Sequence, residues 1–190
     1  MTLYQQLLSY EPVNEQERQD KLAMLAFIDR NADVLDRSNL AGHLTSSAIV
    51  VNPSMDKVLF AHHNIYNSWG WVGGHNDGEP DCLKVAIKET MEETGVSKVH
   101  PYNEDILGID IIHVSNHIKN GQFVNDHLHF NITYLLIADE SDELEINHAE
   151  NSNVKWFPLD SVLDHVTEDR MKPVYTKLFD RVRKIRGSAK

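Results

Sequence analysis

Three glutamates close together in the chain are the residues whose types and spacing best suit chemistry. Glu89, Glu92 and Glu93 have the spacing i, i+3 and i+4, which places them on one face of a helix. The surrounding pattern predicts that helix over 81–94, with an end at Gly95. Three neighbouring carboxylates repel one another, and oxygen ligands without thiols favour Mg²⁺ or Mn²⁺ as the counter-charge. The spacing therefore indicates metal-assisted phosphate chemistry, with a solvated acidic helix face as the alternative.

The glutamates belong to a longer motif. Residues 74–96 read GHNDGEPDCLKVAIKETMEETGV. This segment resembles the Nudix box, the signature of the Nudix hydrolase family, with Gly74 near its start and Gly95 and Val96 at its end in register. The order of the flanking segments extends the resemblance over about 44–165. It implies Mg²⁺-dependent hydrolysis of a diphosphate bond in a compound built as a nucleoside diphosphate linked to another group.

The resemblance also implies roles for single residues. Glu89, Glu92 and Glu93 would hold the metal ion, and Glu92 or Glu93 would orient the attacking water. Glu150 stands on the loop before a late strand, where several family members carry the general base. The preferred interpretation of Glu150 from the residues alone is a surface carboxylate in the acidic stretch 139–150. The family further implies a small nucleotide-like diphosphate as substrate and a homodimer as the assembly.

Two positions depart from the family pattern. Pro80 stands where the family has an early glutamate, and Lys88 stands where it usually has arginine. Lysine does not supply the planar two-pronged donor of arginine, so the bracing of loop to helix is expected to be weaker. We keep Lys88 as a candidate substrate contact. The departures leave open a non-catalytic Nudix domain that senses a nucleotide.

Four of the eleven histidines have suggestive positions. His127 and His129 point to the same side of a predicted strand, so the pair could bind one metal or one phosphate group. With His75 they are candidate substrate contacts, and with His43 they are a candidate second metal site. His43 and His75 also resemble metal histidines of isopentenyl-diphosphate isomerases, but Gly73 stands where those enzymes carry their catalytic cysteine. Isomerase activity is thus a lesser alternative. For the four histidines, the competing interpretation is that they lie apart and each bonds to backbone groups.

The elements that must position these residues alternate in type. Helical patterns cover 1–37, 81–94 and the region around 174–185, while strand patterns cover 47–51, 57–61, 106–117, 122–138 and 154–157. Strands enclosed by helices predict an α+β fold, and the resemblance specifies a Nudix-type α/β/α sandwich with a mixed sheet. We expect a helical extension over 1–40 that packs on a Nudix domain over 41–190.

Composition excludes several classes of function. The 190 residues carry 29 acidic and 18 basic side chains, and the net charge of −11 disfavours nucleic acid and anionic membranes as partners. No apolar run has the length of a membrane span. The single cysteine, Cys82, has no internal partner for a disulfide, and residues 1–20 lack a signal-peptide pattern. These features predict a cytoplasmic protein.

Overall fold

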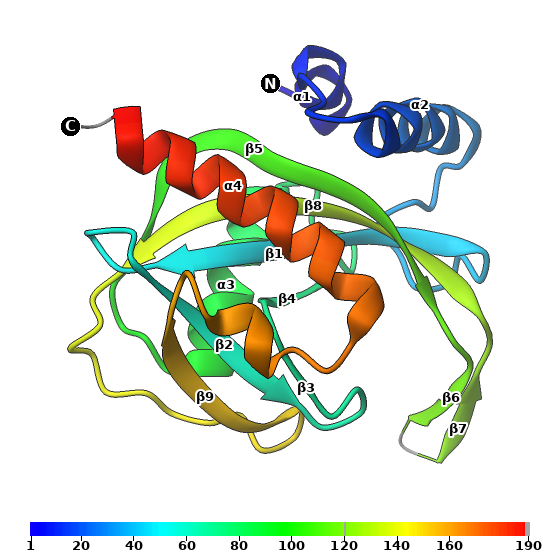
Figure 1. Cartoon of the computed structure of the whole chain (residues 1–190). Coiled ribbons are helices and arrows are strands. Elements are labelled where there is room, and N and C mark those ends of the chain that lie inside the picture. The colour runs from blue at the N-terminus through cyan, green and yellow to red at the C-terminus, as the bar shows by residue number, and fades with distance from the viewer. Residues whose placement is uncertain (120, 189–190) are drawn as a thin grey trace.

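The structure is a computed structural model that describes residues 1–119 and 121–188. Its α-helices are α1 (Leu3–Ser9), α2 (Glu15–Arg30), α3 (Cys82–Thr94) and α4 (Lys172–Ser188), with two short 3₁₀ helices, η1 (Val162–His165) and η2 (Asp169–Met171). The strands are β1 (Gly42–Val51), β2 (Lys57–His63), β3 (Ser68–Gly70), β4 (Val72–His75), β5 (Val99–Val114), β6 (His117–Lys119), β7 (Gln122–Val124), β8 (His127–Ala138) and β9 (Asn151–Pro158). Figure 1 shows their arrangement.

Strand β1 is the centre of a mixed sheet. It pairs with β8 in parallel along its whole length, from Gly42 opposite Leu128 onward. Its end, at Val50 and Val51, continues into an antiparallel hairpin with β2, and its middle, from Thr45 to Ala48, pairs with β4. Strand β5 extends the sheet beyond β8, while β3 and β9 both pair with β2. The middle of β1 therefore has β4 on one side and β8 on the other.

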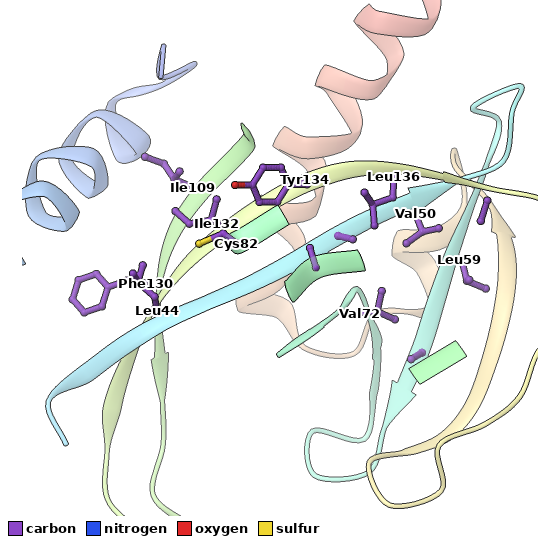
Figure 2. Close-up of a cluster of buried hydrophobic side chains, with 14 of the residues drawn as sticks. Leu44, Val50, Leu59, Val72, Cys82, Ile109, Phe130, Ile132, Tyr134 and Leu136 are labelled. Carbon is purple, nitrogen blue, oxygen red and sulfur yellow. The ribbon is translucent and has the colours of Figure 1, made fainter. Parts of the chain in front are cut away.

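The two faces of the sheet carry separate hydrophobic cores because successive side chains of a strand point to opposite sides. Ala48 and Val50 of β1 belong to the core under α3 (Figure 2), which also contains Cys82 of that helix. Ile49 of β1 belongs to the core under α4, with Phe179 of that helix. Helix, sheet and helix thus form three layers (Figure 1), and the predicted α+β, α/β/α architecture is confirmed.

The N-terminal helices lie beside β5 (Figure 1). Helix α2 begins after Asn14, because the side chain of Asn14 accepts a hydrogen bond from the backbone N–H of Glu17. The buried Glu17 carboxylate lies 3.0 Å from Lys177 Nζ and 3.3 Å from Arg181 Nη2, both on α4. Lys177 Nζ also lies 2.6 Å from Asp110 Oδ1 of β5. This network of charges joins the N-terminal helices to the layered domain.

The structure differs from the sequence-based expectations in three places. The helical pattern over 1–37 forms two separate helices, α1 and α2, and residues 31–37 are not helical. Residues 73–78 read as a glycine-rich loop, but Gly73, Gly74 and His75 belong to β4. Glycine has a low strand propensity, and here pairing with β1 decides the conformation. The strand predicted from residue 106 begins earlier, at Val99, and the two predicted strands 106–117 and 122–138 are joined through a separate small hairpin of β6 and β7. Residue 120, in the turn expected between these two strands, lies outside the described residues.

Within the two described ranges, none of the helices combines the length and the apolar content that crossing a membrane requires.

Candidate active site

A cavity of about 530 Å³ lies where β1, β4 and β8 run side by side. Four glutamates belong to its lining: Glu89 and Glu93 from α3, Glu150 from the segment just before β9, and Glu168 just before η2. Six histidines also line it, and four of them come from the three strands β1, β4 and β8: His43, His75, His127 and His129. Acidic and imidazole groups from distant parts of the chain therefore face the same space.

Glu93 is the most buried of the acidic residues in this cavity, with 5% of its surface exposed. Its Oε1 accepts a hydrogen bond of 2.7 Å from the Gly73 backbone N–H, and its Oε2 accepts one of 2.8 Å from Asn151 Nδ2. Burial raises the pKa of Glu93 to about 7, with a smaller contribution from repulsion by Glu150 and Glu89. The carboxylate is thus fixed in orientation and changes its charge near neutral pH.

Glu89 lies one helical turn earlier and approaches β4. A Cβ atom placed on Gly74 would lie 2.6 Å from the Glu89 carboxylate carbon, so only glycine permits this approach. Burial also raises the pKa of Glu89. Lys88 Nζ lies 3.1 Å from a carboxylate oxygen of Glu89 and 3.1 Å from one of Glu92. Glu92 and Lys88 are exposed, and neither belongs to the lining of the cavity.

The four histidines form a compact cluster. One ring nitrogen from each of them lies within 4.8 Å of the others. In residues 1–119 and 121–188 this is the one group of three or more histidine, cysteine or acidic side chains whose ligand atoms are this close. The pairing of the strands explains the cluster, because His43 of β1 lies opposite His129 of the parallel β8. His75 enters from β4, opposite Thr45 of β1.

The hydrogen bonds and the charges of these rings are defined by their surroundings. His127 Nδ1 lies 2.8 Å from the Asn125 carbonyl, and its Nε2 lies 3.1 Å from His129 Nε2. Burial, together with the neighbouring histidines, lowers the pKa of His129 to about 2. Burial also lowers the pKa of His43. His43 and His129 are therefore neutral at physiological pH.

Two buried asparagines, Asn131 and Asn151, orient polar groups at the site, and sequence reasoning did not find them. Asn151 orients Glu93, as described above. Asn131 of β8 accepts hydrogen bonds of 2.9 Å from the hydroxyls of Thr45 and Ser47 on the neighbouring β1. In the sequence, Asn131 is marked only as an amide residue within an apolar strand pattern. Asn151 is marked only by its position next to Glu150.

Aromatic side chains form other parts of the wall. The rings of Trp69 and Trp71 pack edge-on against Phe157 and Tyr175 of the core, at 4.8 and 5.3 Å between centroids. Tyr66, between β2 and β3, and Phe123, on β7, line the same cavity with 40% and 68% of their surfaces exposed. Exposed rings of this kind are available for stacking against a ligand.

The sequence matches the family model of the NUDIX domain over residues 42–178, which is most of the chain. The chain belongs to the Nudix family. Among curated proteins, it is 27% identical over 150 residues to an RNA pyrophosphohydrolase of Pelagibacter ubique, covering 72% of this chain and 89% of the relative. It is 31% identical over 113 residues to an RNA pyrophosphohydrolase of Dinoroseobacter shibae, covering 57% of this chain and 69% of the relative.

A solved structure has the same fold. A NUDIX family hydrolase from Clostridium perfringens superposes with a TM-score of 0.53 at 20% sequence identity, over 75% of this chain and 97% of that one. The Nudix match begins at residue 42, the first residue of β1. The division into an extension over 1–40 and a domain over 41–190 stays a prediction.

The Nudix box has the local structure that its sequence predicts. The side chain of Asp81 caps the start of α3 by accepting a hydrogen bond from the Lys84 backbone N–H, and Gly95 ends the helix with a φ of +74°. Glu79 forms an ion pair with Lys84 at 2.5 Å, on the exposed side of the loop. This ion pair connects the loop before α3 to the first turn of the helix, although Pro80 and Lys88 depart from the usual pattern.

Proposed function

We propose that this Nudix hydrolase cleaves a diphosphate bond in a small nucleotide-like molecule, with Mg²⁺ or Mn²⁺ as its cofactor. The observation that carries the proposal is the gathering of Glu89, Glu93 and Glu150 in the lining of one cavity. A volume of about 530 Å³ falls within the range of small-molecule and cofactor sites. The coarser activity, hydrolysis of pyrophosphate bonds, follows from membership of the family.

The residues present fit a hard divalent cation. Their donors are carboxylate oxygens, which Mg²⁺ prefers, and the pKa values of Glu89 and Glu93 are raised, in part by repulsion among the carboxylates. The ammonium of Lys88 already lies between Glu89 and Glu92, so the pair accommodates a positive charge. Glu89, Glu92 and Glu93 would hold the ion. When bound, it would neutralise the diphosphate and favour ionisation of a water molecule.

The proton of the attacking water needs an acceptor in the chain. Glu93 is suited because its pKa of about 7 matches physiological pH, and because Gly73 and Asn151 fix the direction of its two oxygens. Glu150 is the second candidate, since it lines the cavity beside Glu93 and is partly exposed. Glu92 stays a candidate from the sequence alone. Separate variants can distinguish these carboxylates.

The substrate would lie between the carboxylates and the remaining walls. His75, His127 and His129 can donate or accept hydrogen bonds to phosphate oxygens, and Lys88 can contact a phosphate that extends toward solvent. The exposed ring of Phe123 is placed to stack on a base. The names of the two curated relatives favour a second candidate substrate, an RNA with a 5′-terminal pyrophosphate bond.

A substrate panel tests the proposal directly. Nucleoside triphosphates, nucleotide sugars, ADP-ribose, dinucleoside polyphosphates, coenzyme A, isopentenyl diphosphate and a 5′-triphosphorylated RNA are incubated with the protein, with and without Mg²⁺. Products are identified by mass. We expect metal-dependent release of a mononucleotide or phosphate from a small nucleotide. Turnover of RNA alone would replace the proposal and overturn the predicted absence of nucleic acid partners.

Carboxylate variants assign the roles. Glu93→Gln is expected to lower kcat by a factor on the order of 10³, because it removes the fixed carboxylate. Glu150→Gln is expected to lower it by a factor on the order of 10² if that residue accepts the proton, whereas the exposed control Glu143→Gln stays within about twofold. Unchanged turnover in Glu93→Gln would contradict the mechanism. Ligand binding without turnover in the wild type would favour a sensor.

A homodimer and a cytoplasmic location stay predictions from the sequence.

A further inference from the structure

We infer that His43, His75, His127 and His129 form a binding site for a divalent transition-metal ion, separate from the carboxylates of α3. The four rings come from β1, β4 and β8, and a nitrogen of each lies within 4.8 Å of the others. A single exposed histidine would not indicate a metal site. Four imidazoles that converge from three strands on one point leave space between them that a cation can fill.

An unsatisfied buried atom lies in the cluster. His43 has 5% of its surface exposed, and its Nε2 has no hydrogen-bond partner. An orphaned ring nitrogen in a buried position costs free energy unless a further group binds it. The His43 ring lies 4.9 to 5.1 Å from each of the other three rings, between centroids. A metal ion at the centre of the cluster would satisfy this nitrogen.

The surrounding carbonyls prepare the rings for coordination. His127 Nδ1 donates to the Asn125 carbonyl at 2.8 Å, which leaves the lone pair on Nε2 facing the cluster. His43 Nδ1 lies 3.4 Å from the Asn39 carbonyl, a longer contact that favours the same tautomer. Metal-binding histidines commonly donate their second N–H in this way. The outer hydrogen bonds thus point the Nε2 atoms inward.

The distances require little movement of the side chains. His127 Nε2 and His129 Nε2 are 3.1 Å apart, close to the separation of about 3.0 Å expected for two adjacent nitrogens of an octahedral ion bound at roughly 2.1 Å. The widest separation in the cluster, up to 4.8 Å, exceeds the distance of about 4.2 Å between opposite nitrogens of an octahedral ion by roughly half an ångström. Small rotations of the rings close this difference.

The donor set selects the kind of ion. Four imidazole ligands suit Zn²⁺, Fe²⁺, Co²⁺ or Ni²⁺, whereas Mg²⁺ prefers oxygen ligands. An ion here would place two positive charges in the same cavity as Glu89 and Glu93, where they would attract the phosphate groups of a ligand.

Elemental analysis and a cobalt titration test the site. Protein without a histidine tag is stripped with chelator, incubated with Zn²⁺ or Co²⁺, dialysed and analysed for bound metal and for visible absorption. We expect about one equivalent per chain in the wild type, with absorption bands of nitrogen-bound Co²⁺. The double variant His127→Gln/His129→Gln should retain less than a tenth of an equivalent and lose those bands.

Two controls keep the result specific. His100→Gln replaces an exposed histidine outside the cavity lining, and it should bind metal like the wild type. Glu93→Gln should also bind one equivalent, which distinguishes this site from the proposed carboxylate site. Circular dichroism establishes that the double variant is folded; if it is not, the single variant His129→Asn replaces it. No bound metal in the wild type, or equal binding in the cluster variant, would overturn the inference.

Discussion

Glu93 owes its properties to two donors that lie far from it in the sequence. The Gly73 N–H and the Asn151 side chain each donate to one of its oxygens, and both favour the charged form against the effect of burial. An isolated glutamate on a helix would have neither a fixed direction nor a pKa near 7. The chemistry of the residue thus depends on β4 and on the start of β9.

Asn151→Ala is expected to move the pH dependence of hydrolysis. Loss of the Nδ2 donor raises the pKa of Glu93 further, so a smaller fraction of the carboxylate is ionised at pH 7. We expect kcat/KM to fall about tenfold at pH 7 and much less at pH 9, with the acid limb of the profile shifted upward. Steady-state rates between pH 6 and pH 9 measure this shift.

The neighbouring amide provides the control. Asn153→Ala changes an exposed residue two positions along β9, and its profile should match that of the wild type. An equal loss at every pH in Asn151→Ala would mean that the asparagine acts on the fold and not on Glu93.

At the scale of elements, the contact between β4 and α3 builds the acidic wall. Gly73 approaches β1 and Gly74 approaches Glu89 so closely that neither position has room for a Cβ. The two glycines meet different obstacles, however. Gly73 faces the backbone of β1 at a φ of +153°, whereas Gly74 faces the far end of a flexible side chain. Substitution of Gly73 should therefore lower mainly the stability of the fold, and substitution of Gly74 should lower mainly the activity.

Gly73→Ala is expected to destabilise the fold by about 3 kcal/mol or more, because its Cβ would lie 2.6 Å from the Ser47 Cα atom. Gly74→Ala should cost less than about 1 kcal/mol, because the Glu89 side chain can rotate away. The displaced carboxylate should nevertheless lower activity at least tenfold and weaken activation by Mg²⁺. Urea denaturation and a Mg²⁺ titration of the hydrolysis rate measure the two effects. A strongly destabilised Gly74→Ala with normal specific activity would refute this assignment.

At the scale of the whole molecule, a buried charge network connects α2, β5 and α4. Lys177 contacts Glu17 and Asp110, and Arg181 contacts Glu17. Burial raises the pKa of Asp110 from its ordinary value of 3.8 to about 6, although Lys177 acts in the opposite direction. Folding therefore carries a pH dependence that originates far from the cavity.

The sign follows from proton binding. Between about pH 4 and pH 6 the native state keeps the Asp110 proton that the unfolded chain has lost, so this group's contribution to stability declines as the pH rises. Asp110→Asn removes that dependence. Relative to the wild type, the variant should gain on the order of 2 kcal/mol in unfolding free energy between pH 4 and pH 7. Urea denaturation across this range measures the difference.

An exposed aspartate gives the comparison. Asp164→Asn should keep a constant difference from the wild type at all pH values. A constant difference for Asp110→Asn as well would show that its native pKa is not raised.

The sequence by itself determined the parts of this protein that depend on local spacing. The i, i+3, i+4 glutamates and the glycine after the helix predicted α3, because each acts within one or two helical turns. The Nudix box, a local motif over 74–96, likewise identified the family. The bounds of β3 and β4 did not follow, since glycine-rich segments become strands only when a neighbour pairs with them.

Only the tertiary structure decided which histidine and glutamate side chains lie together in the cavity. The parallel register of β1 and β8 places His43 beside His129, and β4 adds His75 from a third strand. The tertiary structure also places Glu93 and Glu150 in the lining of the cavity, while Glu92 and Lys88 lie outside that lining. Strand register over long sequence separations depends on the packing of the whole sheet, and no local pattern encodes it.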